Sequence, residues 1–245
     1  MHVLDLFSGI GGGSLGLRWV GMRTVAFCES DPFATSVLQR HWPGVPIYPD
    51  IRTLTAGRLR HDGVPRPQLV IGGFPCQDIS LAGQGAGLDG PKSSLWHHMA
   101  RLVRECGPRW VVVENVPGLR VRGADRVCDD LAASGYTVWP LVVGAVHAGA
   151  PHRRQRAWVL ARQTMADTAG AGLEKRPRRA SLPAPSLLIE RGSGWPAEPG
   201  IRRVADGVPN RVDRVRSLGN AIVPANAAMI GRAILRAEQA LRQRR

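Results

Sequence analysis

The stretch HVLDLFSGIGGG, residues 2 to 13, decides the fold, because an apolar run there ends in a cluster of glycines. The run from His2 to Phe7 predicts a strand, and the glycines predict a tight turn that opens a helix ending near Gly21. A second apolar run, Thr24 to Cys28, predicts a strand that ends at Glu29. A strand, a helix and a second strand in this order are typical of a parallel β-α-β unit.

The same alternation continues along the chain. Asp31 followed by Pro32 predicts a capped helix that reaches about Gln39. Further expected elements are a strand at Gln68–Ile71, a helix at Leu95–Arg104, a strand at Trp110–Val113, a helix before Gly135, and strands at Thr137–Val143 and Ala157–Leu160. We therefore expect an α/β fold with a doubly wound, mostly parallel sheet of the Rossmann-like type.

The rhythm breaks between residue 163 and about residue 200, where Gly, Pro, Ser and Arg are frequent and periodicity is weak. It returns in a helix that begins at Pro224, whose apolar residues follow 3.6-residue spacing: Ala227, Ile230, Ile234, Ala237 and Leu241. We predict three parts: a sheet domain (residues 1–162), a small irregular lobe (163–205), and a return segment with a C-terminal helix that packs on the sheet domain (206–245).

The net charge of +14 is distributed unevenly. Residues 1–150 carry 14 Lys and Arg against 12 Asp and Glu, whereas residues 151–245 carry 19 against 7. A nearly neutral part is typical of an ordinary catalytic domain, and a strongly basic part is typical of a surface that binds nucleic acid. The alternative, a genome that favours arginine everywhere, would not spare the first 150 residues.

The remaining composition narrows the setting. The chain has 245 residues, of which 44% are hydrophobic, enough for one sizeable core. Its four cysteines show neither disulfide-framework nor metal-ligand spacing, so we expect no metal and a reducing, cytoplasmic location. There is no export signal and no run of eighteen apolar residues, so we expect neither export nor membrane insertion.

One cysteine, Cys76, stands out by its position. In the segment VIGGFPCQDIS, residues 70 to 80, a buried-strand pattern ends in Gly72 and Gly73, and Pro75 fixes the backbone just before the sulfur. Such a turn presents a thiol to a ligand and favours a nucleophile. The alternative is an inert buried cysteine, which is common.

Two more strand ends carry polar residues. The first glycine turn suits a cofactor that carries a nucleoside, with Glu29 placed for the ribose hydroxyls and Asp50 with Ile51 placed for an adenine. The alternatives are a glycine turn that is purely architectural and, for Asp50 taken alone, a loop or capping residue. Glu114 follows three valines and is costly to bury without a partner, so it favours a hydrogen-bonding group or a general acid. The cationic turn PHRRQR, residues 151 to 156, is either a solvated charge run or a phosphate or active-site contact.

In order along the chain, these segments resemble the DNA cytosine-5 methyltransferases. The resemblance rests on DLFSGIGGG (5–13), Glu29, Asp50, GGFPCQDIS (72–80), SSLW (93–96), ENVPG (114–118), Arg154 with Arg156, and GNAIVP (219–224). It runs from residue 3 to the final helix. Only about residues 163–200 are left uncovered, where this family keeps its target-recognition region.

The resemblance implies an S-adenosylmethionine-dependent methyltransferase that acts on double-stranded DNA. The implied cofactor residues are Phe7, Gly9, Ile10, Gly11, Gly12, Glu29, Ser30, Asp50, Ile51, Pro75, Leu95, Asn220 and Ala221. The implied catalytic residues are Cys76, Glu114, Arg154 and Arg156, and the expected DNA contacts are Gln77, Ser80, Arg153, Arg178 and Arg179. We expect a monomer in a bacterial or phage-infected cell, with a cognate restriction endonuclease as a candidate partner.

The implied chemistry adds the Cys76 thiolate to cytosine C6, so that C5 can take a methyl group, and then eliminates the thiolate. Glu114 would contact N3 and the exocyclic amine, and Arg154 would favour the thiolate. The target base must leave the duplex stack. His152 stands where the family often has glutamine, and the short recognition region predicts a short or loose target sequence. Two alternatives stay open: an RNA (tRNA) cytosine-5 methyltransferase, and a catalytically silent DNA-binding relative.

Overall fold

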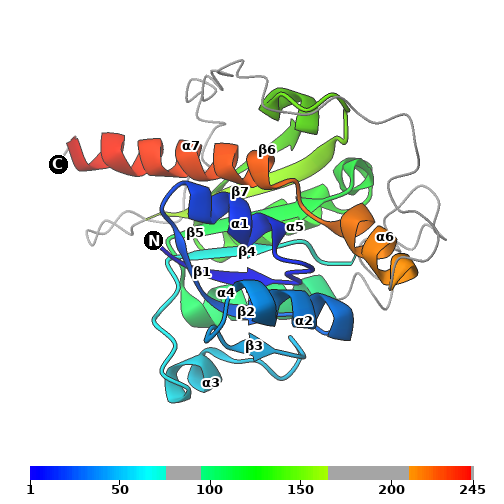
Figure 1. The fold of residues 1–245 in the computed structure, drawn as a ribbon. Helices are drawn as coiled ribbons and strands as arrows, with labels where there is room; N and C mark the ends of the chain where they lie inside the picture. Colours follow the sequence, from blue (N-terminus) through cyan, green and yellow to red (C-terminus); the bar gives the residue numbers. More distant parts are fainter. Residues whose placement is uncertain (76–94, 165–209, 244–245) are drawn as a thin grey trace.

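The core of the protein is a mixed β-sheet. A computed structural model of the chain describes residues 1–75, 95–164 and 210–243. In this part of the chain the sheet has seven strands in the order β3-β2-β1-β4-β5-β7-β6 (Figure 1). Their bounds are β1 His2–Leu6, β2 Arg23–Cys28, β3 Ile47–Tyr48, β4 Leu69–Gly72, β5 Trp110–Asn115, β6 Tyr136–Val143 and β7 Arg156–Gln163. Strands β1 to β5 pair in parallel, and β7 is antiparallel to both β5 and β6, which confirms the expected mostly parallel sheet.

Helices connect the strands and cover both faces of the sheet. They are α1 Gly12–Trp19, α2 Pro32–His41, α3 Ala56–His61, α4 Leu95–Cys106, α5 Ala124–Ala133, α6 Arg211–Asn220 and α7 Pro224–Gln243, with short 3-10 helices η2 Pro117–Val121 and η3 Ala145–Ala148. The N-cap at α2 is as predicted, because the Asp31 carboxylate accepts a hydrogen bond from the Ala34 amide at 2.9 Å.

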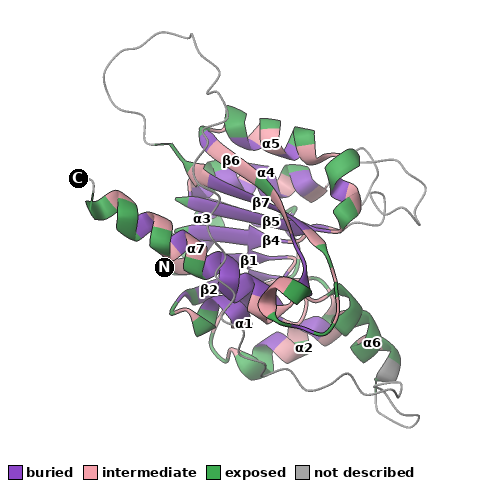
Figure 2. Ribbon diagram, turned by 90° about the horizontal axis from the view of Figure 1, so that it is seen from above, coloured by how far each residue is buried: buried purple, intermediate pink, exposed green. Residues whose placement is uncertain are grey.

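Side chains that alternate along the strands build two apolar clusters, one on each face. Val3, Ile71 and Val112 face the cluster that contains Leu17 of α1 and Ile230 of α7. Their neighbours along the strands face the cluster that contains residues of α3, α4 and α5, such as Leu59, Met99 and Leu131. Figure 2 shows the buried residues gathered in the strands and along α1. This is the doubly wound arrangement that the sequence predicts.

The C-terminal helix α7 packs on the sheet domain as predicted. Ala227, Ile230 and Ile234 are buried, and α7 lies against α1 (Figure 1). Near its other end, the buried Glu238 carboxylate accepts hydrogen bonds from Arg109 (2.5 Å) and Trp110 (3.0 Å) at the start of β5. Burial raises the pKa of Glu238, but these donors outweigh burial and leave that pKa below its usual value.

The residues from Val212 to Gln243 also meet the length and hydropathy criteria of a membrane-spanning helix. Length and hydropathy alone do not separate a membrane span from a buried core helix, so the expectation of no membrane insertion stays a prediction.

Three elements differ from the sequence-based expectations. Strand β3 and helix α3 are short, and their apolar residues are too few to produce a periodic signal. Helix α6 carries three apolar residues, but Val212, Val215 and Leu218 are exposed, so no buried stripe marks it. The predicted recognition region, residues 163–205, lies almost entirely outside the described residues, and its boundaries stay a prediction.

Candidate active site

The site lies where the strand order reverses. From β1 the chain runs outward to β2 and β3, and then returns to β4 on the other side of β1. The carboxyl ends of β1 and β4 therefore flank a topological switch point, the usual ligand position in an open α/β sheet. The glycine turn after β1 and the Gly73–Pro75 exit after β4 both leave the sheet there, as the sequence predicts.

The turn after β1 has an unusual backbone. Phe7 lies at φ 54°, Gly9 at φ 53° and Gly11 at φ 82°, all in the left-handed region. A Cβ on Gly9 would meet nothing within 4 Å, whereas a Cβ on Gly12 would lie 2.2 Å from the Ile222 carbonyl oxygen. The turn is thus open at Gly9 and packed tightly at Gly12 against the residues that precede α7.

Glu29 at the end of β2 holds this turn in place. One carboxylate oxygen accepts a hydrogen bond from the Gly9 amide at 2.7 Å, and the other accepts from the amides of Ser30 and Asp31, both at 2.8 Å. Helix α1 begins at Gly12 without a side-chain cap and without an acidic residue in its first turn. A carboxylate that can accept hydrogen bonds from ribose hydroxyls, placed beside an open glycine turn, fits a cofactor that carries a nucleoside, such as S-adenosylmethionine.

A buried polar network beneath this turn was not singled out from the sequence. The Asp5 carboxylate accepts a hydrogen bond from the Ser14 hydroxyl at 2.6 Å, and Ser14 in turn accepts from the Thr24 hydroxyl at 2.7 Å. Burial raises the pKa of Asp5 to about 7. The signal in the sequence was an acidic residue inside an apolar strand, and the network ties β1, β2 and α1 together at the turn.

The expected adenine contacts lie in the loop after β3. Ile51 is buried, and its carbonyl accepts a hydrogen bond from Arg101 of α4 at 2.9 Å. The Asp50 carboxylate pairs with Arg52 at 2.8 Å, and hydrogen bonds from Arg52 hold the pKa of Asp50 below its usual range. Leu95 packs against the core cluster at the start of α4.

Glu114 at the end of β5 has the partner that its burial requires. Its side chain is 8% exposed, and its carboxylate lies 3.0 Å from Nε of Arg156 at the start of β7, which pairs with β5. Burial raises the pKa of Glu114 to about 7, although the charges of Arg156 and Arg154 oppose the rise. A carboxyl group that titrates near neutrality can donate or accept a proton at physiological pH.

The chain that leads toward Cys76 passes directly over Glu114. A Cβ on Gly73 would lie 3.0 Å from Oε2 of Glu114, so glycine allows this close approach. The next residue is held by Asn115, whose buried amide donates to the Phe74 carbonyl at 3.1 Å and whose Oδ1 accepts from the Val116 amide at 2.8 Å. In the sequence Asn115 stands out only as part of the ENVPG segment, which does not reveal this role.

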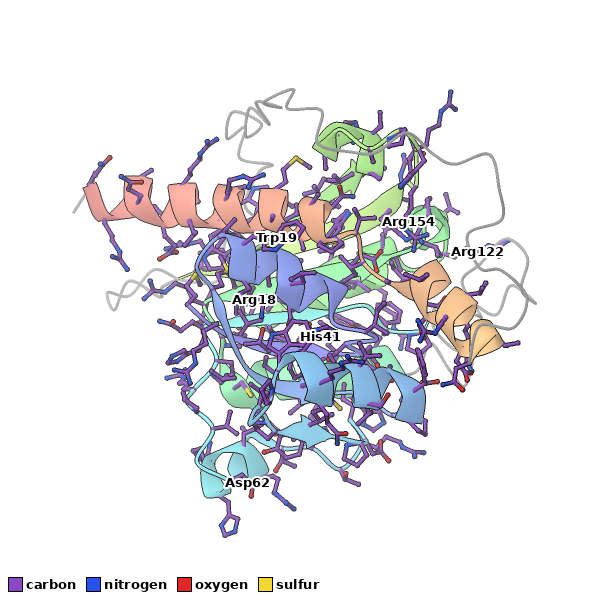
Figure 3. All side chains as sticks on the ribbon, in the orientation of Figure 1. Arg18, Trp19, His41, Asp62, Arg122 and Arg154 are labelled. Carbon is purple, nitrogen blue, oxygen red and sulfur yellow. The ribbon has the colours of Figure 1, made fainter. Side chains whose placement is uncertain are left out.

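Arg154 lies beside the C-terminal end of α6. Its Nη2 donates to the carbonyls of Gly219 at 2.6 Å and Ala221 at 2.8 Å, at the end of α6 (Figure 3). Arg153 is exposed, and its carbonyl accepts a hydrogen bond from the Ala145 amide. Asn220 and Ala221 thus lie next to Arg154, and Ile222 follows them onto the glycine turn.

Five of the predicted site residues lie outside the described part of the chain: Cys76, Gln77, Ser80, Arg178 and Arg179. Within residues 1–75, 95–164 and 210–243, no group of three or more His, Cys, Asp and Glu side chains could hold a metal ion.

The sheet is doubly wound, its switch point carries an open glycine turn, and the end of β5 carries a buried carboxyl-arginine pair. These features are typical of a cofactor-binding α/β enzyme. Comparison with known families agrees, because residues 1–181 match the family described as C-5 cytosine-specific DNA methylase. The chain belongs to this family.

Curated relatives match about two thirds of the chain. It is 39% identical over 169 residues to the type II methyltransferase M2.BsuMI of Bacillus subtilis, which covers 66% of this chain and 42% of that protein. It is 34% identical over 162 residues to the type II methyltransferase M.HgiCII of Herpetosiphon aurantiacus, covering 64% of this chain and 36% of that protein. The matched part spans less than half the length of these relatives.

Solved structures agree on the fold. A putative DNA modification methyltransferase encoded within an E. coli prophage is 28% identical, with a TM-score of 0.57, and the match covers 66% of this chain and 47% of that one. The Entamoeba histolytica methyltransferase EhMeth matches 97% of this chain and 98% of its own, with a TM-score of 0.68. Its identity is 14%, so it supports the fold alone.

Proposed function

We propose that this protein is a DNA (cytosine-5-)-methyltransferase that uses S-adenosylmethionine. The observation that carries the proposal is the buried Glu114, paired with Arg156 and lying directly under the backbone of Gly73, three residues before Cys76. This arrangement brings a carboxyl group to the segment that carries the proposed nucleophile. Membership of the cytosine-specific methylase family supports the same reaction.

In the proposed reaction the Cys76 thiolate forms a bond to cytosine C6, and the electron pair of the C5–C6 double bond moves toward C5 and N3. Glu114 hydrogen-bonds or protonates N3, which stabilises the developing negative charge. Arg156 orients the Glu114 carboxylate through the 3.0 Å contact. After C5 has gained the methyl group, loss of the C5 proton re-forms the double bond and expels the Cys76 thiolate.

The cofactor supplies an electrophilic methyl group on a sulfonium centre. The proposed holders are the glycine turn at Phe7 and residues 9–12 together with Glu29. The loop at Asp50 and Ile51, and residues Pro75, Leu95, Asn220 and Ala221, complete the pocket. The open space at Gly9 and the carboxylate beside it support this assignment.

The proposed substrate is double-stranded DNA, from which the target cytosine is flipped. The excess of 19 basic over 7 acidic residues in residues 151–245 supports phosphate contacts there. Arg153 is exposed beside the site and is proposed as one such contact, together with Gln77, Ser80, Arg178 and Arg179. The short region 163–205 leads us to expect a recognition sequence of fewer than six bases.

Bisulfite sequencing of a random-sequence DNA pool, methylated by the purified protein, measures both the reaction and its specificity. We expect 5-methylcytosine at cytosines in a short shared sequence context. Strict selectivity for six or more bases would contradict the proposal for the recognition region but not the proposal for the chemistry.

A matched assay separates the two alternatives. Methyl transfer to duplex DNA and to tRNA is measured in parallel, and transfer to tRNA alone would favour an RNA methyltransferase. A catalytically silent relative would bind DNA and the cofactor but methylate neither substrate. Cys76→Ala should abolish methylation and leave cofactor binding nearly unchanged, and loss of both would mean that Cys76 has a structural role.

A further inference from the structure

The guanidinium of Arg154 is directed at backbone carbonyls. Its Nη2 donates to Gly219 at 2.6 Å, to Ala221 at 2.8 Å and to Leu218 at 3.4 Å. These carbonyls belong to the last turn of α6 and its C-cap, which have no partner within the helix. A cation at a helix C-terminus also interacts favourably with the negative end of the helix dipole. Arg154 therefore fastens the end of α6 to the loop that precedes β7.

The residues that follow α6 pack closely against the glycine turn and the start of α1. An ideal Cβ on Gly12 would lie 2.2 Å from the Ile222 carbonyl oxygen, and one on Gly16 would lie 2.0 Å from the Pro224 carbonyl oxygen. Glycine at both positions lets α1 approach this backbone more closely than any side chain would allow. The glycine turn and residues 219–224 of the return segment therefore form one packed unit, and a shift of one requires a shift of the other.

The backbone of Arg154 is itself constrained. Its φ of 27° is rare for a residue with a side chain, and such a conformation persists only where its surroundings enforce it. The Arg153 carbonyl accepts a hydrogen bond from Ala145 at 2.9 Å, and a Cβ on Gly144 would lie 2.6 Å from the same oxygen. This loop is thus fixed to η3, and two residues later Arg156 pairs with Glu114. The backbone from which the Arg154 side chain extends is therefore held in a fixed position.

We propose that Arg154 is a positioning residue for the cofactor: it holds the return segment against the glycine turn, and so sets cofactor affinity before any DNA is bound. This inference rests on the proposed function. It differs from a role in which Arg154 stabilises the Cys76 thiolate or contacts a phosphate, because neither of those roles requires Arg154 for binding of the cofactor alone. The two kinds of role predict different effects on binding of the cofactor alone.

The test measures the affinity of the full chain for S-adenosylhomocysteine by titration calorimetry, without DNA. We expect Arg154→Ala to weaken binding by about tenfold or more, because the hydrogen bonds to Gly219 and Ala221 are lost. Arg154→Lys keeps a cation that can donate to one carbonyl, and we expect it to recover part of the affinity. The matched control is Arg232→Ala on the exposed face of α7, which should bind within twofold of the wild type.

A second readout, amide hydrogen exchange, separates positioning from a general loss of structure. Amide hydrogen exchange at residues 219–223 should speed up in the cofactor-free Arg154→Ala protein, while exchange in β1, β4 and β5 stays slow. If Arg154→Ala does not fold, the same two measurements on Arg154→Lys decide, with weaker binding and faster local exchange expected.

Unchanged S-adenosylhomocysteine affinity in folded Arg154→Ala, or in Arg154→Lys where the alanine variant does not fold, would overturn the inference. In that case a loss of methylation would assign Arg154 to the substrate. If the wild-type protein itself does not bind S-adenosylhomocysteine, it is the proposed cofactor that fails, and this result is distinct from a failure of the Arg154 inference.

Discussion

The pH dependence of stability should reveal the burial of Glu114. Its carboxyl keeps a proton in the folded protein up to about pH 7, because burial raises its pKa from 4.5. The unfolded chain loses this proton near pH 4.5, so the folded state binds more protons between these values. The free energy of unfolding of the wild type should therefore fall as the pH rises through this window.

The magnitude follows from the size of the shift. A rise from 4.5 to about 7, at 1.36 kcal/mol for each pKa unit, corresponds to about 3 kcal/mol lost between pH 4.5 and 8. Glu114→Gln has nearly the same shape and no titrating group. We therefore expect its free energy of unfolding, minus that of the wild type, to increase by about 3 kcal/mol over this range.

Urea denaturation of both cofactor-free proteins at pH 5, 6, 7 and 8 measures this difference. Asp5 has a pKa raised to about 7 by burial and would add a pH dependence of the same sign. It is present in both proteins, so its contribution cancels in the difference. A difference that stays constant with pH would refute the argument that Glu114 is held in a low-dielectric site beside Arg156.

Two further substitutions test the packing around the site. Gly12→Ala places a Cβ 2.2 Å from the Ile222 carbonyl oxygen, so we expect it to lower the free energy of unfolding by about 1–3 kcal/mol and to weaken cofactor binding. The control is Gly57→Ala in α3, where a Cβ has no contact closer than 3.6 Å and the change should be neutral or stabilising. Equal stabilities of the two variants in thermal or urea unfolding would contradict the packing argument. Asn115→Ala removes the hydrogen bonds to Phe74 and Val116, so it should lower the free energy of unfolding by about 1–3 kcal/mol and slow the reaction of Cys76. Asn115→Asp keeps only the acceptor and should also lose the hydrogen bond to the Phe74 carbonyl. Wild-type reaction rates in both variants would show that Asn115 does not position the segment that leads to Cys76.

Much of the fold could be predicted because its strands are apolar and its glycines are clustered. The runs at Val3 and Val111, the glycine turn and the Asp31-Pro32 cap each carry a local signal that the structure confirms. The short β3 and α3 lack such a signal. The exposed α6 depends instead on a tertiary contact, because its last carbonyls are held by Arg154 from the loop before β7.

The candidate site was predicted in part for the same reason. Glu114 was expected to need a partner because a carboxylate after three valines is costly to bury, and Arg156 is that partner. Two features depend on which backbone groups come together in space. They are the hydrogen bonds of the Arg154 guanidinium to the end of α6 and those of the Asn115 side-chain amide to Phe74 and Val116. No pattern along the sequence encodes such distances, so the structure was needed to reveal them.

The central claim is that Cys76 attacks a flipped cytosine with the help of Glu114. Duplex DNA that contains 5-fluorocytosine tests it most directly, because fluorine at C5 cannot be removed as a proton and the thiolate is not expelled. With S-adenosylmethionine present, we predict a covalent protein–DNA adduct that survives denaturing electrophoresis, is absent in Cys76→Ala and forms more slowly in Glu114→Gln. No adduct with the wild-type protein, or an equal adduct with Cys76→Ala, would contradict the account.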